Sequence, residues 1–302
     1  MSSPSDSTLA DGTDIRVTRG DRDLLARDHG PAGGSPVVFH HGSPGCRLLG
    51  EEVTAAAAGR GLRLISYDRP GYAGSMSHPG RRVADAAWDA AAIVDALGID
   101  RFAVWGISGG GPHALACAAL LPDRITGAAV VCGVAPFDGA GLDFYDGMGE
   151  SNRTEWDIAR HDRERLEPFV REASAEVLAS PAGVLEAWGT LLSDGDREIL
   201  LGGYGETMLG RMRVAMEPGI DGWMEDDIAF VEPWGLDPAG ITVPVAVFHG
   251  RQDTMVPHGH GAWLAGVIPG ARFNSYPGDG HLTLGFDSAR PLDWLAEVRA
   301  AG

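Results

Sequence analysis

Short apolar runs alternate with helical segments over most of the chain, and this alternation constrains the fold more than any other feature. The runs are rich in Val, Ile and Phe, as is typical of strands buried on both faces of a parallel sheet. They occupy residues 15–19, 24–27, 37–40, 62–67, 102–107, 127–132, 243–249 and 272–276. Segments between them, such as 83–97 and 112–121, have apolar residues at helical spacing. The pattern predicts an α/β fold with a mostly parallel eight-stranded sheet flanked by helices, and an antiparallel hairpin across Gly20 and Asp21.

The alternation stops near residue 137, and strands resume only at residue 243. The interval contains charged, aromatic and Met residues, with helical spacing over 155–173, 182–192 and 206–216. We therefore expect a helical cap, or lid, at 138–235, inserted into a core made of 15–137 and 236–302. Residues 1–14 are rich in Ser and Asp and lack the basic and apolar regions of a signal peptide, so we expect a disordered tail there.

The charge of the chain excludes several classes of function. A net charge of −18 is unsuited to nucleic acid or to an anionic membrane surface, because both require clustered cations. All 24 basic residues are arginine, which excludes mechanisms that use a lysine amine. The three cysteines, an odd number without metal-site spacing, are expected to be small buried residues in a reducing compartment, which favours a cytoplasmic location.

The most specific motif is Gly106-Ile107-Ser108-Gly109-Gly110, which follows an apolar run and precedes a helical segment. A serine on a tight turn between strand and helix has a strained backbone, and its neighbours two positions away must lack a Cβ. Such a turn presents the hydroxyl above the sheet at the N-terminus of the helix. The glycine spacing does not match the dinucleotide-binding pattern G-x-G-x-x-G. The motif therefore predicts Ser108 as a catalytic nucleophile.

A serine nucleophile needs a base, and the base needs a carboxylate that orients it. His281 follows the last expected strand, and Asp253 follows the strand before it. Both positions are at the carboxyl ends of parallel strands, where open α/β sheets build their sites. We predict His281 as the base and Asp253 as the acid; Asp279 is the alternative acid, although it precedes His281 by only two residues.

Two backbone N–H groups are expected to bind the oxyanion, one from the residue after the nucleophile and one from the loop after the third strand. The first is that of Gly109. In the loop, Pro44 has no N–H, so Ser43 is the expected second donor. We expect His40 or His41 to shape this loop by hydrogen bonding rather than to bind a metal.

No metal or cofactor is expected. His258 and His260 could form a ligand pair, but the chain has no H-E-x-x-H motif and no cysteine near them. We interpret both as surface histidines.

These motifs together resemble the α/β-hydrolase superfamily, in its capped serine esterase and lactonase-like branch. The resemblance lies in 41–45 (His-Gly-Ser-Pro-Gly), 67–75 (Tyr-Asp-Arg-Pro-Gly-Tyr-Ala-Gly-Ser), the Ser108 motif, 249–253 (His-Gly-Arg-Gln-Asp) and 280–281 (Gly-His). It implies that the loop containing Arg69 is a structural turn, not a catalytic one. Ser108 also distinguishes the chain from relatives that use an aspartate nucleophile.

The expected cap offers side chains for an apolar substrate pocket. We predict Phe144, Trp156, Met208 and Met212 as substrate-binding residues. Met208, Met212 and Met216 recur every four residues and share a helix face, which is also typical of packing between cap and core.

The predicted function is hydrolysis of a small or medium carboxylic ester or lactone through an acyl-enzyme on Ser108. Four alternatives stay open: acyl transfer, hydrolysis of a carbon–carbon bond by the same triad, a weakly catalytic ligand-binding protein, and cofactor-free oxygenation, which the sequence neither supports nor excludes. The expected partner is a small ester-like molecule, and a homodimer is left open.

Overall fold

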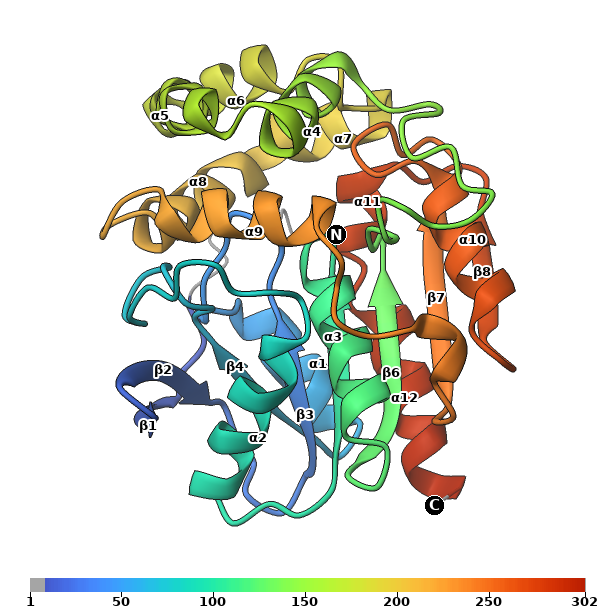
Figure 1. The fold of residues 1–302 in the computed structure, drawn as a ribbon. Coiled ribbons are helices and arrows are strands. Elements are labelled where there is room, and N and C mark those ends of the chain that lie inside the picture. The colour runs from blue at the N-terminus through green and yellow to red at the C-terminus, as the bar shows by residue number, and fades with distance from the viewer. Residues whose placement is uncertain (1–8, 302) are drawn as a thin grey trace.

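An eight-stranded sheet with the order β1-β2-β4-β3-β5-β6-β7-β8 runs through the computed structural model, which describes residues 9–301 (Figure 1). β1 pairs antiparallel with β2, β2 pairs antiparallel with β4, and the remaining pairs are parallel. The strands are β1 (Thr13–Arg19), β2 (Arg22–Asp28), β3 (Ser35–His40), β4 (Leu62–Tyr67), β5 (Phe102–Ile107), β6 (Ile125–Val131), β7 (Val245–Gly250) and β8 (Arg272–Tyr276). The predicted mostly parallel sheet with an N-terminal hairpin is confirmed.

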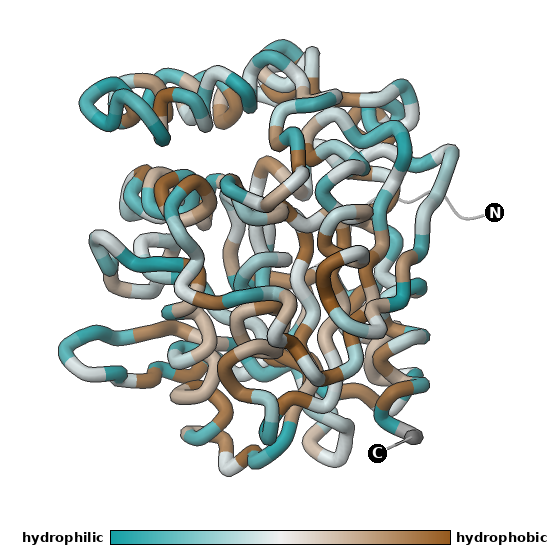
Figure 2. Tube along the Cα trace, turned by 45° about the vertical axis from the view of Figure 1, so that its right-hand side comes forward, coloured by the Kyte–Doolittle hydropathy of each residue, from teal (hydrophilic) through white to brown (hydrophobic). Residues whose placement is uncertain are grey.

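Helices cover both faces of the sheet, because alternate residues of the central strands are buried on opposite sides. Val38, Val104 and Val130 belong to one apolar cluster, which includes residues of α2 (Asp85–Ala96), α3 (Gly110–Leu120) and α10 (His258–Val267). The opposite face packs against α1 (Glu51–Gly59) and α12 (Ala289–Ala301). Figure 2 shows hydrophobic segments gathered in the body around the sheet and hydrophilic segments along the outer loops.

Six α-helices lie between β6 and β7 in the described chain and cover one end of the sheet (Figure 1). They are α4 (Glu150–His161), α5 (Arg163–Ala179), α6 (Pro181–Ala187), α7 (Asp194–Ile199), α8 (Gly205–Ala215) and α9 (Asp221–Val231). A π-helical turn (Leu200–Tyr204) joins α7 to α8, and a 3-10 turn (Pro238–Gly240) follows α9. We refer to these helices and the turns between them as the cap, and to the rest of the described chain as the core. None of the helices in residues 9–301 is both long and apolar enough to cross a membrane.

The structure corrects several expected elements. Residues 1–8 of the expected tail lie outside the described residues, but Leu9 already pairs with Gly50 and Ala10 is buried. The helix expected over 155–173 is broken at Asp162, where φ is −147° and ψ is 67°. The segment 182–192 is helical only to Ala187. The short helix α7 and the longer α9 were not expected, and both contribute to the site described below.

Candidate active site

Ser108 occupies the sharp turn between β5 and α3, with a φ of 54°. Its backbone N–H donates to the carbonyl of Val131 on the neighbouring strand at 2.8 Å, and its carbonyl accepts from Gly111 N at 2.8 Å. A Cβ at Gly106 would overlap the Gly110 carbonyl, and a Cβ at Gly110 would overlap that of His40. Glycine is therefore required at both positions, as the sequence motif predicts.

His281 and Asp253 form a buried pair at the same end of the sheet. His281 Nδ1 lies 2.8 Å from Asp253 Oδ2, so the neutral ring would donate from Nδ1 and keep Nε2 free as an acceptor. Asp253 Oδ1 accepts from the backbone N–H groups of Met255 and Val256 at 3.0 and 2.8 Å, which orients the carboxylate. Asp279, the alternative acid, forms an ion pair with Arg290 instead. Ser108 and His281 both line one cavity between core and cap.

The charges around this pair favour the ion pair over the neutral state. Burial alone would lower the pKa of His281, but the carboxylates of Asp253 and Asp196 outweigh burial and raise it above 6.5. Burial alone would raise the pKa of Asp253, but His281 and His249 outweigh it and lower it. An imidazolium formed at His281 during proton transfer is thus stabilised.

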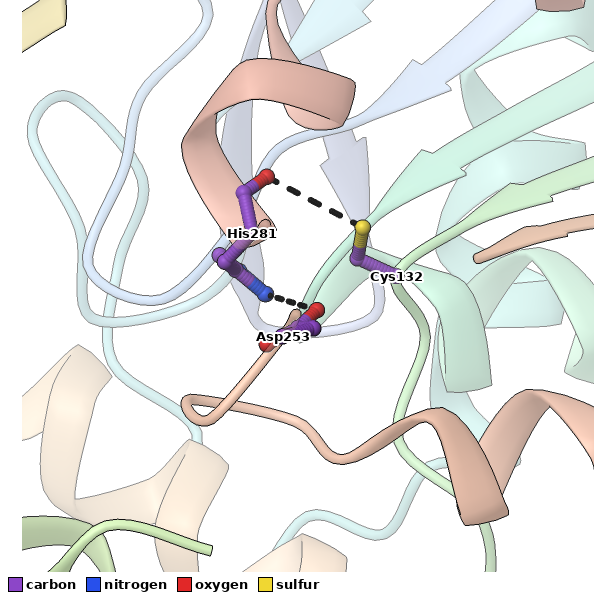
Figure 3. A group of neighbouring side chains, drawn as sticks. All are labelled: Cys132, Asp253 and His281. Atoms are coloured by element: carbon purple, nitrogen blue, oxygen red, sulfur yellow. Dashed lines mark hydrogen bonds and ion pairs between the residues drawn. The ribbon is translucent and has the colours of Figure 1, made fainter. Parts of the chain in front are cut away.

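Cys132 is the third side chain of this group, as Figure 3 shows. Its Sγ lies 3.8 Å from the His281 carbonyl, to which it donates. Burial and the charge of Asp253 raise the thiol pKa well above its ordinary value, so Cys132 remains protonated. Because metals bind the thiolate, and Nδ1 is already bonded to Asp253, the three residues are poorly suited to hold a metal ion.

The loop expected to bind the oxyanion, residues 41–45, lies against Ser108, and we call it the oxyanion loop. A Cβ at Gly42 would be 3.5 Å from Ser108 Cβ, and a Cβ at Gly109 would overlap Ser43 Oγ. Within the described residues, the backbone N–H groups of Ser43 and Gly109 have no hydrogen-bond acceptor. Two free donors beside the serine are the arrangement that an oxyanion requires.

His41 shapes this loop, as expected for one of the two histidines. Arg69 N donates to His41 Nε2 at 3.2 Å, so the proton of the neutral ring is on Nδ1, which donates to the Gly42 carbonyl at 2.7 Å. Burial and the nearby Arg69 hold the pKa of His41 well below 6.5, in agreement with a neutral ring.

Arg69 has a larger role than that of a turn residue. Its guanidinium, fully buried, donates to the carbonyls of His41 and Gly42 and, at 2.9 Å, to Ser43 Oγ. It also forms an ion pair of 2.6 Å with Asp226 of α9. Arg69 therefore fixes the backbone of the oxyanion loop.

Asp226 is the cap's contribution to this network. It is fully buried, pairs with Arg69 and with Arg81 at 2.6 Å each, and accepts from Tyr72 Oη at 2.9 Å and from Ser43 Oγ. Burial alone would raise its pKa, but the two arginines outweigh burial and lower the pKa well below 3.8. Sequence reasoning missed Asp226, because a helix was not expected at α9.

A second cap carboxylate, Asp196 of α7, holds the segment that carries His281. It accepts from the backbone N–H groups of His281, Leu282 and Thr283 at 3.1, 2.9 and 2.8 Å. These are the first three residues of α11 (His281–Gly285), so Asp196 caps this short helix from outside. The cap is thus joined to the core at two places, through Asp226 at the oxyanion loop and through Asp196 at the segment that carries His281.

Two cavities meet at Ser108. The larger, of about 240 Å³, is mostly apolar, and Met208, Met212 and Trp188 line its cap side. The smaller cavity, of about 50 Å³, has Trp156 in its lining. Of the predicted substrate-binding residues, only Phe144 lines neither of the two cavities in the described structure. Its ring packs against those of Phe137, Tyr145, Trp156 and His260.

The interpretation of His258 and His260 as surface histidines is wrong for His260. His260 is buried, with Nδ1 accepting from Ala135 N at 3.1 Å and Nε2 beside the Phe144 carbonyl at 2.9 Å. His258 is half-buried and bonds to Ser275. Both histidines therefore make contacts within the fold. The three cysteines are buried, as expected.

The strand order, the serine on a positive-φ turn after β5 and the histidine–aspartate pair after the last two strands define the hydrolase class of α/β protein. The family model described as alpha/beta hydrolase fold matches residues 35–288. The chain therefore belongs to the α/β-hydrolase family.

Among curated proteins, the chain is 28% identical to a non-heme haloperoxidase of Rhodococcus erythropolis, over 91% of each chain. It is 25% identical to a bifunctional esterase/perhydrolase of Acinetobacter calcoaceticus, over 88% of this chain and 91% of that one. Among solved structures, a thermophilic esterase from Thermogutta terrifontis matches with a TM-score of 0.66 and 22% identity, over 96% of this chain and 99% of that one. The last likeness concerns the fold alone.

Proposed function

We propose that the protein is a serine hydrolase that cleaves small or medium carboxylic esters or lactones through an acyl-enzyme on Ser108. One observation carries the proposal: Ser108, on its positive-φ turn, shares a cavity with the Asp253-bound His281 and lies beside two N–H groups that have no acceptor in residues 9–301. The names of the relatives, an esterase/perhydrolase among them, support ester chemistry.

In the proposed mechanism, His281 Nε2 removes the proton of Ser108 Oγ as Oγ attacks the substrate carbonyl. The negative charge of the tetrahedral intermediate lies on the carbonyl oxygen, which the N–H groups of Ser43 and Gly109 bind. His281 then gives its proton to the leaving alkoxide, and the acyl-enzyme remains. A water molecule, deprotonated by His281, attacks the acyl group, and Ser108 leaves with the proton returned by His281. No step uses a metal or a cofactor.

The two cavities suggest how an ester is bound. The larger, mostly apolar cavity suits the bulkier part of the substrate, and the smaller one, beside Gly109, suits a short acyl group. Acyl transfer to an acceptor other than water uses the same residues. The names haloperoxidase and perhydrolase, borne by relatives, favour this second candidate, with a peroxide as acceptor.

The test uses a fluorophosphonate probe and p-nitrophenyl esters of graded acyl length, with Ser108→Ala as the variant. We expect labelling to disappear and kcat to fall by about 10⁴-fold or more, because the nucleophile is lost. Thr18→Ala, which removes an exposed hydroxyl on β1, serves as the matched control and should change neither. Unchanged labelling and turnover in Ser108→Ala would contradict the proposal. Turnover that requires added peroxide would favour the second candidate.

A further inference from the structure

Two carboxyl groups of the cap contact each other beside the smaller cavity, and the proposed mechanism does not use them. Glu155 lies on α4 and Asp227 on α9, and both are buried. Trp223 Nε1 donates to Glu155 Oε1 at 2.5 Å, and the Trp156 side chain bonds to Asp227. Asp227 Oδ2 is buried and receives no N–H or O–H of residues 9–301. We call Glu155 and Asp227 the acid pair.

The acid pair differs from its neighbour Asp226 in having no countercharge. Asp226 pairs with two arginines, whereas within the described residues no arginine or histidine forms an ion pair with Glu155 or Asp227. Burial, together with the charge of Glu155, raises the pKa of Asp227 well above 3.8. Burial also raises the pKa of Glu155. When ionised, either group is a buried charge without a countercharge in residues 9–301, which is costly, and a cation from outside the chain would relieve that cost.

The walls of the smaller cavity also suit a cation. Its lining includes the side chains of Trp156, Trp223 and Phe230, in addition to the acid pair and Ser108. The faces of aromatic rings attract cations, most of all where water is excluded. A space of about 50 Å³ holds an ammonium group with one or two carbon atoms but no long chain.

The position of the acid pair fixes which part of a substrate such a cation belongs to. Ser108 and Gly109 line the same small cavity as Glu155 and Asp227. A cation bound there lies within a few bonds of the carbonyl that Ser108 attacks. We propose that the smaller cavity binds the protonated amino group of an α-aminoacyl ester, with the leaving alcohol in the larger apolar cavity. This inference rests on the proposed function.

The experiment compares alanine methyl ester with methyl isobutyrate, which has a methyl group in place of the ammonium group. Hydrolysis is followed by acid release at pH 7, where most of an α-amino group of pKa about 7.7–8.0 is protonated. The α-ammonium group withdraws electrons and itself makes the ester more reactive, so the rates at which hydroxide hydrolyses the two esters serve as the reference. We expect the ratio of the kcat/KM values, alanine ester over methyl isobutyrate, to exceed the ratio of the hydroxide rates by at least about tenfold, because hydrogen bonds to a charged group are strong. A kcat/KM ratio no larger than the ratio of the hydroxide rates overturns the inference.

Asp227→Asn and Glu155→Gln test whether the acid pair causes the preference. Each should lower the ratio of the two kcat/KM values by about tenfold. Asp157→Asn, an exposed carboxylate on the same helix α4, is the matched control and should leave the ratio unchanged. An unchanged ratio in folded Asp227→Asn and Glu155→Gln overturns the inference; if neither variant folds, the wild-type ratio decides.

The two proposals fail in different ways. Hydrolysis of methyl isobutyrate that depends on Ser108, without preference for the alanine ester, overturns only the aminoacyl inference. If neither ester is cleaved and Ser108 is not labelled by the fluorophosphonate, the proposed hydrolase function fails and the inference fails with it.

Discussion

The protonation of His281 is controlled by carboxylates from two different parts of the chain. In the proposed mechanism His281 must be neutral to accept the Ser108 proton, and Asp253 and Asp196 outweigh burial and raise its pKa above 6.5. Activity should therefore be lost as pH falls through that raised pKa, so the rising limb of kcat/KM against pH lies above 6.5. This prediction is checked by measuring kcat/KM against pH with an ester that has no titratable group. A rising limb below pH 6.5 would contradict the prediction.

Asp253→Asn removes the nearer of these charges. It should move the limb to lower pH and reduce kcat by about 10⁴-fold, the usual result of losing the orienting carboxylate of a triad. Asp279→Asn is the control, because Asp279 was the alternative acid and its carboxylate pairs with Arg290. A larger loss in Asp279→Asn than in Asp253→Asn would reverse the assignment of the acid.

Single residues were predictable from the sequence where local backbone geometry determines the residue type. The positive φ of Ser108 requires small neighbours, so its position is visible in the five residues around it. Arg69 was expected to be only a turn residue. Its larger role was missed because its partners His41 and Asp226 come from distant parts of the chain. A single sequence contains no sign of such long-range pairs.

At the scale of elements, helix α11 depends on a cap residue that is 85 positions away in sequence from His281. Asp196→Ala leaves the first N–H groups of α11 without an acceptor. The free energy of unfolding should fall by about 0.5–2 kcal/mol, as for other caps, and the pH limb should move down, since a carboxylate near His281 is lost. Urea denaturation and the pH profile measure these effects. Asp194→Ala, an exposed acid in the same turn of α7, is the control, and equal effects of the two variants would refute the capping role.

Helix α9 connects the cap to the oxyanion loop through Asp226. Asp226→Asn leaves Arg69 and Arg81 buried without a countercharge, which typically costs about 3–5 kcal/mol. We expect that loss in urea denaturation and a lower kcat with little change in KM, because the loop positions donors for the transition state. Asp221→Asn, exposed at the start of α9, should have neither effect. A normal kcat in Asp226→Asn would show that the loop is held without the cap.

The strands and core helices were predictable because burial on both faces produces long apolar runs. The cap was harder, since its helices are short and half-exposed. In α9, three consecutive acids at 225–227 interrupt the apolar pattern, and two of them, Asp226 and Asp227, are buried. The burial of Asp226 is stabilised by Arg69, from the loop after β4, whereas Asp227 bonds to the Trp156 side chain of α4 and has no countercharge in the described residues. Helical periodicity alone does not indicate such burial.

At the scale of the whole molecule, cap and core together line the larger cavity. Trp105 of β5 and Met208 of α8 both line that cavity, so residues of core and cap together bound it. Met208→Trp adds volume to the cap side of the lining and leaves Ser108, His281 and the oxyanion loop unchanged in sequence. It should lower kcat/KM for hexyl acetate by about tenfold or more, because a single methylene group in an apolar pocket changes kcat/KM by about 10–200-fold, while kcat/KM for methyl acetate should change little. Leu201→Trp, exposed on the π-helical turn of the same cap, is the control. A narrowed alcohol site must discriminate between esters by the length of the alcohol. If Met208→Trp instead lowers kcat/KM equally for methyl and hexyl acetate, the alcohol part of the ester does not occupy this cavity.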